Sequence, residues 1–366
     1  MSLSAALAMF FRASATFSLW TAVGLAAPSF IGPLNVIKVH DSTMPANNDV
    51  NPYGVAVVPR TVGNLHEGSI LVSNFNDSMN FQGTGTTIVQ VPPGDGPVTV
   101  FAQIDATHLP GPCPGGVGLT TALAVLRSGW VIVGSLPADG GQPANAMAGC
   151  LLVLNSSGTV VETISGGAIN GPWDMTALDR GSSAMLFVTN VLDGTVAAGG
   201  GVVTNGKVIR IDLKIGDHMP TVTSTTIIGS GFSQRTDPMA LVIGATGVGL
   251  GLGDNPTLYV ADTLNNRIAA IPNAVSRTSP FGTGTTVIGG GAVNGPLGLA
   301  IAPNGDIVVV NSNDGNMVEI TPEGSQVAVK PVDVTEMGGG TLFGLAIVSN
   351  AVYFVNDGNN TLDILQ

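Results

Sequence analysis

The sequence predicts an all-β protein built from six similar units, and three observations support this prediction. Charged residues make up only 10% of the 366 residues, while 51 Gly and 23 Pro mark many turns. Two short patterns recur together six times along the chain. Further strand-like runs follow each pair at short range, which is typical of an antiparallel meander.

The first pattern is a turn residue and Pro, then a bulky residue, a small residue and an apolar run. Its copies cover residues 51–57, 171–177, 237–243 and 295–301, with weaker copies at 121–125 and 343–347. We predict that each copy forms the innermost strand of its unit.

The second pattern is a β-branched or aromatic run that ends in Asn or Asp. The strand ends are Asn74, Asn190, Asp262, Asn311 and Asn356, and a sixth copy, which ends in Ser135, keeps only the frame of the pattern. The last two spacings between successive strand ends, of 49 and 45 residues, fit the propeller blade period of ~40–50 residues. The longer spacings require insertions, which Gly-rich stretches supply.

Units of four strands cannot bury both faces alone, so they must stack on one another around an axis. The sequence therefore predicts one six-bladed β-propeller over residues 28–366, with four-stranded antiparallel blades. Residues 34–39 form an isolated strand pattern, and the last unit has only three clear strands before Gln366. We predict that the N-terminal strand completes the last blade and closes the ring, which also removes an exposed edge.

Two segments resemble the NHL repeat. They are residues 258–268, which read LYVADTLNNRI, and residues 296–310, which contain the turn Pro303-Asn304-Gly305-Asp306. The resemblance extends over residues 35–366 and implies a secreted, six-bladed propeller of bacterial type. It indicates architecture and not function.

The N-terminus has the features of an export signal. Residues 13–27 are apolar or small, follow Arg12, and end in Gly24-Leu25-Ala26-Ala27-Pro28. We predict a signal peptide over residues 1–27 and a secreted or periplasmic protein. The alternative is an uncleaved anchor, although this stretch is shorter than the ~20 residues that span a bilayer. No other segment is long and apolar enough to cross a membrane.

Cys113 and Cys150 lie in the same unit, and an even cysteine count in an exported chain predicts a disulfide bond between them. The alternative is two buried thiols.

The net charge is −12, from 12 basic and 24 acidic residues, and no Lys/Arg cluster occurs. We therefore expect neither nucleic acid nor an anionic membrane surface as a partner. A small molecule, a glycan or a protein on one face of the propeller is expected instead.

The bulky residues of the first pattern should surround one mouth of the central channel. They are Tyr53, Thr121, Trp173, Met239, Leu297 and Phe343. Tyr53, Trp173, Met239 and Phe343, with the adjacent Asp174 and Asp237, are the candidate ligand-binding residues, because aromatic rings at an opening suit a sugar or another flat ligand. The alternative is a hydrophobic plug between the blades, with both acids capping turns.

Long loops at residues 77–85, 136–149 and 193–206 should lie on the same face as this mouth. They contain almost no charge and many Gly and Ala. Such loops form either a binding rim or a flexible fringe.

The sequence contains no Gly-x-Ser-x-Gly, His-Glu-x-x-His or Cys-x-x-Cys motif. The strand-end Asn and Asp residues suit Asx turns better than a metal site, and the four histidines have no metal-ligand spacing. Six-bladed lactonase-type propellers hold a divalent metal through a Glu at the start of the first blade, where this chain reads Asn51-Pro52-Tyr53. Lyases of similar architecture use channel histidines, which this chain lacks.

Three hypotheses for function follow. The preferred one is a non-catalytic propeller that binds a ligand or partner through its loop-rich face, without a cofactor. The second is a metal-dependent hydrolase, lactonase or lyase with a remodelled centre, which uses a divalent metal, Asp174, Asp237 and nearby Asn side chains. The third is a structural interaction module at the cell surface.

Overall fold

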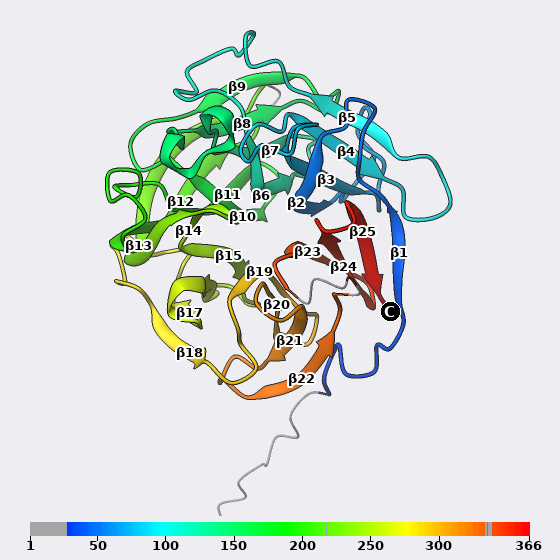
Figure 1. Ribbon diagram of the computed structural model, residues 1–366, viewed down its shortest axis with the longest axis vertical. Coiled ribbons are helices and arrows are strands. Elements are labelled where there is room, and N and C mark those ends of the chain that lie inside the picture. Colours follow the sequence, from blue (N-terminus) through cyan, green and yellow to red (C-terminus); the bar gives the residue numbers. More distant parts are fainter. Residues whose placement is uncertain (1–27, 217, 334, 336–338) are drawn as a thin grey trace, which may run out of the picture.

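The computed structural model describes residues 28–216, 218–333, 335 and 339–366. The predicted signal peptide lies outside these residues. Six antiparallel sheets surround a central axis, and the chain passes through them in order (Figure 1). The protein is therefore a six-bladed β-propeller, as predicted.

Each blade is an antiparallel sheet whose innermost strand comes first in the chain, except that the N-terminal strand supplies the outer strand of the last blade. The blades are β2 (Val50–Val57), β3 (Ile70–Asn76), β4 (Thr87–Val91) and β5 (Thr99–Gln103); β6 (Leu119–Val125), β7 (Val131–Ser135), β8 (Cys150–Leu154) and β9 (Val160–Ile164); β10 (Pro172–Asp179), β11 (Ser183–Asn190), β12 (Val203–Lys214), β13 (Thr221–Asp237) and β14 (Leu241–Ile243); β15 (Ala245–Leu250), β16 (Leu258–Asp262), β17 (Arg267–Ile271) and β18 (Thr285–Gly289); β19 (Pro296–Ile301), β20 (Ile307–Asn311), β21 (Asn316–Ile320) and β22 (Gln326–Pro331); and β23 (Leu342–Val348), β24 (Ala351–Asn356), β25 (Thr361–Leu365) and β1 (Ile37–Ser42).

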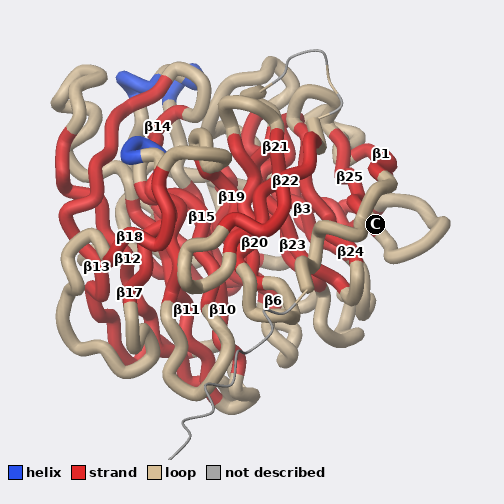
Figure 2. Tube along the Cα trace, turned by 90° about the horizontal axis from the view of Figure 1, so that it is seen from below, coloured by secondary structure: helices blue, strands red, loops and turns tan. Residues whose placement is uncertain are grey.

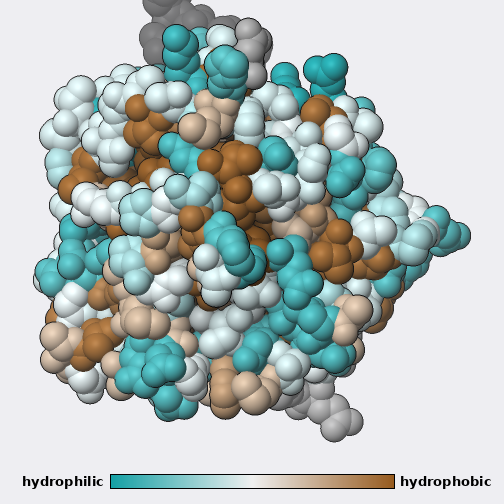
Figure 3. All heavy atoms as spheres, turned by 90° about the horizontal axis from the view of Figure 1, so that it is seen from above, coloured by the Kyte–Doolittle hydropathy of each residue, from teal (hydrophilic) through white to brown (hydrophobic). Residues whose placement is uncertain are grey.

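The core lies between blades and not within them. The second strands β3, β7, β16 and β20 are buried along their whole length, because both of their faces pack against a neighbouring blade. The outer strands β5 and β22 are largely exposed. Hydrophobic and polar side chains mix on the rim beside β5 and β9 (Figure 3). The β-branched runs of the second pattern thus supply the apolar layers that hold the ring together.

Strand β1 pairs with β25, so the sheet order of the last blade is β1-β25-β24-β23. The register runs from Ile37 opposite Leu365 to Ser42 opposite Thr361. The predicted closure of the ring by the N-terminal strand is confirmed.

The segment 29–31, just before β1, is held by a second contact. Glu319 on β21 is fully buried. Its carboxylate accepts hydrogen bonds from Ser29 Oγ at 2.5 Å, from the amides of Phe30 and Ile31 at 2.6 and 2.8 Å, and from Asn304 Nδ2 at 3.1 Å. The segment therefore docks on the fifth blade while β1 completes the sixth.

The boundary between the third and fourth blades differs from the prediction. The copy at residues 237–243 does not form the innermost strand of the fourth blade, because β14 pairs with β13 and extends the third blade. The innermost strand is β15, whose Ala245 lies opposite Asp262. The apolar run continues through this region, so the first pattern, which begins at Asp237-Pro238, predicts the innermost strand several residues before its actual start at Ala245.

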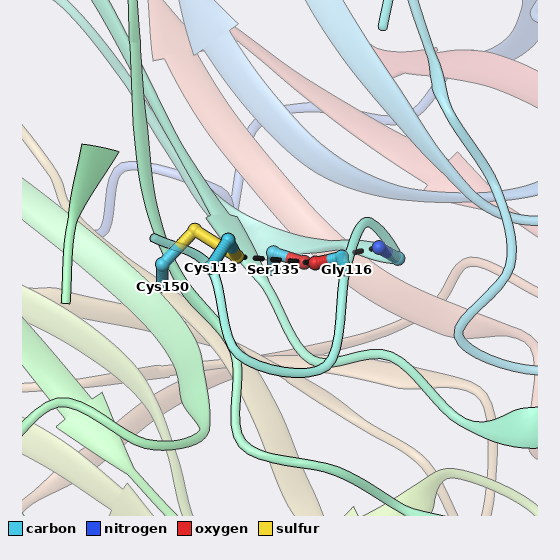
Figure 4. The surroundings of a disulfide bond; sticks show 5 residues. Cys113, Gly116, Ser135 and Cys150 are labelled. Atoms are coloured by element: carbon cyan, nitrogen blue, oxygen red, sulfur yellow. Dashed lines mark hydrogen bonds between the residues drawn. A yellow bond between two sulfur atoms is a disulfide. The ribbon is translucent and has the colours of Figure 1, made fainter. Parts of the chain in front are cut away.

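The predicted disulfide joins Cys113 and Cys150 (Figure 4). Cys113 precedes β6, and Cys150 begins β8 directly after the loop 136–149. Beside the bond, Cys113 Sγ lies 3.1 Å from the carbonyl oxygen of Gly116, which also accepts a hydrogen bond from Ser135 Oγ at 2.9 Å. The bond fixes the start of the second blade to its third strand.

Among the described residues, no helix is of the length and apolarity that crossing a membrane requires.

We expect Glu319→Ala to destabilise the protein strongly, because it leaves three donors of the segment 29–31 without an acceptor: the buried amide of Ile31 and the partly buried Ser29 Oγ and Phe30 amide. Each orphaned group costs about 1–3 kcal/mol, so a loss of about 3 kcal/mol or more in the free energy of unfolding is expected. Urea unfolding measures this loss. The exposed Glu323→Ala on the same blade should change stability by less than about 0.5 kcal/mol. Equal effects of the two substitutions would contradict the role of Glu319.

Candidate functional site

An aromatic plug, formed by Tyr53, Phe75, Trp173 and Phe343, divides the central channel. The ring of Tyr53 stacks between Phe343, at 3.8 Å between centroids, and Phe75, at 4.4 Å. Trp173 lies 6.5 Å from Tyr53, and its Nε1 donates to the carbonyl oxygen of Val242 at 3.1 Å. The rings are only 2–3% exposed. Three residues predicted at the mouth are thus close together, but they pack on one another.

The long loops of the first three blades explain this burial. Gln82 Nε2, in the loop 77–85, donates to the carbonyl oxygen of Pro238 at 2.6 Å, and the amide of Ala138 donates to the carbonyl oxygen of Gly83 at 3.2 Å. Leu136 and Ala240 lie against Tyr53 and Trp173. The short helices η1 (Asp139–Gly141), η2 (Pro143–Asn145) and η3 (Thr263–Asn265) lie towards the same face (Figure 2). The loops therefore cover one side of the mouth.

The other side of the mouth is open and holds the mouth pocket, a cavity of about 700 Å³. Its lining comes from the third to sixth blades. The residues are Arg235, Asp237, Met239, Ala240, Ile243, Thr263, Leu264, Asn266, Asn294, Gly295, Leu297, Ser312, Asn313, Gly339, Gly340 and Phe343. Of the predicted site residues, Asp237, Met239 and Phe343 line it, whereas Tyr53, Trp173 and Asp174 do not. Met239 is 75% exposed and lies between β13 and β14, not on an innermost strand.

The charges of the mouth pocket balance. Arg235 Nη2 lies 2.8 Å from Asp237 Oδ2, and the amide of Met239 donates to Asp237 Oδ1 at 2.9 Å. Among the described residues of the lining, these two side chains are the ionisable ones. The described lining of the pocket therefore presents one compact ion pair and no net charge.

The polar wall of the mouth pocket consists of amide side chains held in fixed positions. Asn266 has φ = 51°, and its Oδ1 accepts from the amide of Gly295 at 2.7 Å. Asn313 Nδ2 donates to Asn294 Oδ1 at 3.1 Å, and Asn294 Nδ2 donates to Asp314 Oδ2 at 3.0 Å. Arg235, Asn266, Asn294 and Asn313 were not among the predicted site residues. The three Asn residues had one signal in the sequence, the enrichment of Asn and Asp near strand ends, which also suits turns.

A second cavity, the channel cavity, lies further along the innermost strands on the other side of the plug. It measures about 400 Å³ and is lined by residues of all six blades. Asp174 lines it, and its Oδ2 accepts from the amide of Val248 at 3.0 Å. Burial raises the pKa of Asp174 to about 7, against the lowering effect of the hydrogen bonds from Met175 and Val248.

The side chains do not fit the metal centre of the second hypothesis. Asp174 and Asp237 line different cavities and do not converge. In the described ranges, no group of three or more His, Cys, Asp or Glu side chains could hold a metal ion. The strand-end residues make local contacts instead: Asn311 Nδ2 donates to the carbonyl oxygen of Ala292 at 2.7 Å, and Asp262 binds Arg267 at 2.8 Å.

No family model and no curated protein sequence matches the chain. Solved structures do match. A catalytically inactive virginiamycin B lyase from Staphylococcus aureus, with quinupristin, shares 15% identity and a TM-score of 0.51 over 90% of this chain and 86% of that chain. A putative gluconolactonase shares 13% identity and a TM-score of 0.56 over 93% and 96%. Regucalcin from Agrobacterium tumefaciens, a calcium-binding protein, shares 12% identity and a TM-score of 0.51 over 89% and 93%.

These likenesses define the class of the protein as a six-bladed β-propeller, a fold that it shares with lactonases and a lyase. At such low identity they show the fold alone. Membership of the NHL repeat family stays a prediction.

Replacing Asp174 with Asn should flatten the pH dependence of stability between pH 4 and 7. In this range the folded protein keeps a proton that the unfolded chain releases, because the folded pKa is about 7 and the ordinary value is 3.8. The contribution of Asp174 to stability is therefore least unfavourable at low pH, and it falls, becoming more unfavourable, as the pH rises to about 7. We expect Asp174→Asn to remove on the order of 1–4 kcal/mol of this fall.

Urea unfolding from pH 4 to 8 measures the effect. Some slope should remain, since burial also raises the pKa of Asp357 to about 7 and of Asp363 to about 6. The exposed Asp254→Asn is the control and should keep the wild-type slope. Parallel curves for Asp174→Asn and wild type would contradict the prediction.

Proposed function

We propose that the protein is a binding protein for a small, uncharged, hydroxylated ring, such as a sugar or a sugar lactone, and that the ligand lies in the mouth pocket. The observation that carries this proposal is the fixed wall of amide side chains opposite an apolar floor. Leu297 and Phe343 supply the floor, and Met239 and Leu264 supply apolar edges.

Each part of the pocket suits such a ligand. Amide side chains both donate and accept hydrogen bonds, as hydroxyl groups require, and contacts with their neighbours fix their positions before a ligand enters. The apolar floor suits the C–H face of a ring. Because Arg235 and Asp237 neutralise each other, a charged ligand gains no net attraction in the pocket. A volume of about 700 Å³ is in the usual range for small-molecule sites.

We further propose that the protein acts outside the cytoplasm. The disulfide bond and the signal-like N-terminal sequence support this proposal, since disulfides persist in oxidising compartments.

A panel of monosaccharides and sugar lactones, screened by saturation-transfer NMR, tests binding. We expect at least one member to bind with 1:1 stoichiometry. Asn313→Ala and Met239→Ala should each weaken it, together by at least ~10-fold, because a hydrogen bond and an apolar edge are lost. Asn255→Ala, an exposed amide in the turn before β16, is the matched control and should have no effect. Failure of the whole panel, or binding indifferent to both substitutions, would refute the proposal.

A second candidate function is hydrolysis of a lactone in the same pocket. The fold shared with lactonases and a lyase supports it better than a purely structural role. Within the pocket, the carboxylate of Asp237 would take a proton from water as its oxygen attacks the lactone carbonyl. Arg235 would stabilise the oxyanion. The ring C–O bond then breaks, and the alkoxide takes the proton back from Asp237.

Hydrolysis of δ-gluconolactone, corrected for the uncatalysed rate, tests this second function. We expect Asp237→Asn to lower kcat/KM by ~100-fold or more, since proton transfer is lost. Asp254→Asn should match wild type, and so should wild type in excess EDTA. If the rate does not exceed the background, hydrolysis is refuted and ligand binding remains as the proposed function. Loss of activity in EDTA would refute the metal-free route.

A further inference from the structure

The channel cavity contains a feature that the mouth pocket does not explain. In every blade, the Asn, Asp or Ser that ends the second sequence pattern pairs with a residue of the innermost strand. The residue two positions further along the innermost strand defines one equivalent position in each of the six blades. This residue is Gly54, Gly247, Gly298 or Gly344 in four blades, Thr121 in the second blade and Asp174 in the third. Adjacent blades thus place two polar side chains in a ring that is otherwise glycine.

Both polar side chains are buried in the lining of the cavity. Asp174 is 8% exposed and Thr121 is 4% exposed. The Oγ1 of Thr121 has no hydrogen-bond partner within the described part of the chain. An orphaned buried hydroxyl costs free energy, so it points to a group that it can bind.

Asp174 has no cationic partner in its surroundings. Among the described residues of the lining it is the one ionisable side chain, and no ion pair involves it. Its contacts are hydrogen bonds from backbone amides. A buried carboxylate in this position gains more from a cation than a solvated one does. The excess of 24 acidic over 12 basic residues also attracts cations to the protein.

The rest of the lining offers acceptors and an apolar wall. Each innermost strand lies at the edge of its sheet, so its free backbone carbonyl groups face the channel. Met175, Leu299 and Leu345 supply hydrocarbon surface. Val57 and Ile301, at the far end of the lining, are only half-buried, so solvent reaches this end. A single carboxylate is too few for Ca²⁺ or Mg²⁺, which take several oxygen ligands.

We propose that the channel cavity is a second ligand site, which binds a small primary ammonium compound through the carboxylate of Asp174 and the hydroxyl of Thr121. An ammonium group has three donors, and a backbone carbonyl group takes the third. The short hydrocarbon part of the ligand lies against the apolar wall. The plug separates this site from the mouth pocket, and the described linings of the two cavities share no residue.

Isothermal titration calorimetry with ethanolamine at pH 8, where Asp174 is mostly ionised and the amine still carries its proton, tests the proposal. Ethylene glycol serves as the neutral probe of similar size. We expect 1:1 binding of ethanolamine and at least ~10-fold weaker binding of ethylene glycol. Asp174→Asn should weaken the binding of ethanolamine by at least ~10-fold, because a charge-assisted contact becomes neutral. Thr121→Val, which keeps the shape of the side chain, should weaken it by ~2–10-fold.

Two controls separate this site from others. Asp179→Asn removes a carboxylate from the same strand outside the cavity, and Asp237→Asn changes the mouth pocket without changing the lining of the channel cavity. Both should bind ethanolamine like wild type, and the urea midpoints of all variants confirm folding. The proposal is overturned if wild type binds no ethanolamine, or if Asp174→Asn and Thr121→Val both bind like wild type. Binding of Ca²⁺ that displaces ethanolamine and requires Asp174 would also overturn it.

Discussion

The close approach of the six innermost strands is the constraint on which the rest of the structure depends. A Cβ atom at Gly344 would overlap the carbonyl oxygen of Tyr53, and one at Gly298 would overlap the carbonyl oxygen of Phe343. At these positions the backbone of one blade touches the backbone of the next. The apolar second strands can then pack between blades without voids. The ring is narrow as a result, and four aromatic rings are enough to close it.

The plug has a cost that the surrounding contacts offset. The hydroxyl of Tyr53 is buried without a partner among the described residues, and burial, then the charges of Asp357 and Asp237, raises its pKa. The stacked rings of Phe75 and Phe343 and the loops above them supply the compensating apolar contact. The result is one channel with two chemically different ends: a neutral, amide-walled pocket on the loop face and a cavity with a lone carboxylate on the other.

Much of the fold could be predicted from the sequence because the repeat pairs a turn with a buried strand in every blade. The closure of the ring followed from counting strands, and the disulfide followed from two cysteines in one unit. The fourth innermost strand could not be placed, because Pro238 precedes an apolar run that belongs to the third blade. The site was harder to predict. Whether Tyr53 faces a ligand or another ring depends on loops from other blades, and Asn266 and Asn313 meet only when the ring has formed.

The pairing of β1 with β25 also affects biosynthesis. Strand β1 is synthesised before the intervening blades and β25 after them, so the ring cannot close while those blades are being made. Until then, the last blade lacks its outer strand, and both partners expose unpaired backbone edges, which are prone to aggregation. Contacts so distant in sequence also form slowly. A chain of this design benefits from being kept unfolded, or bound by a chaperone, until β25 is available to pair with β1.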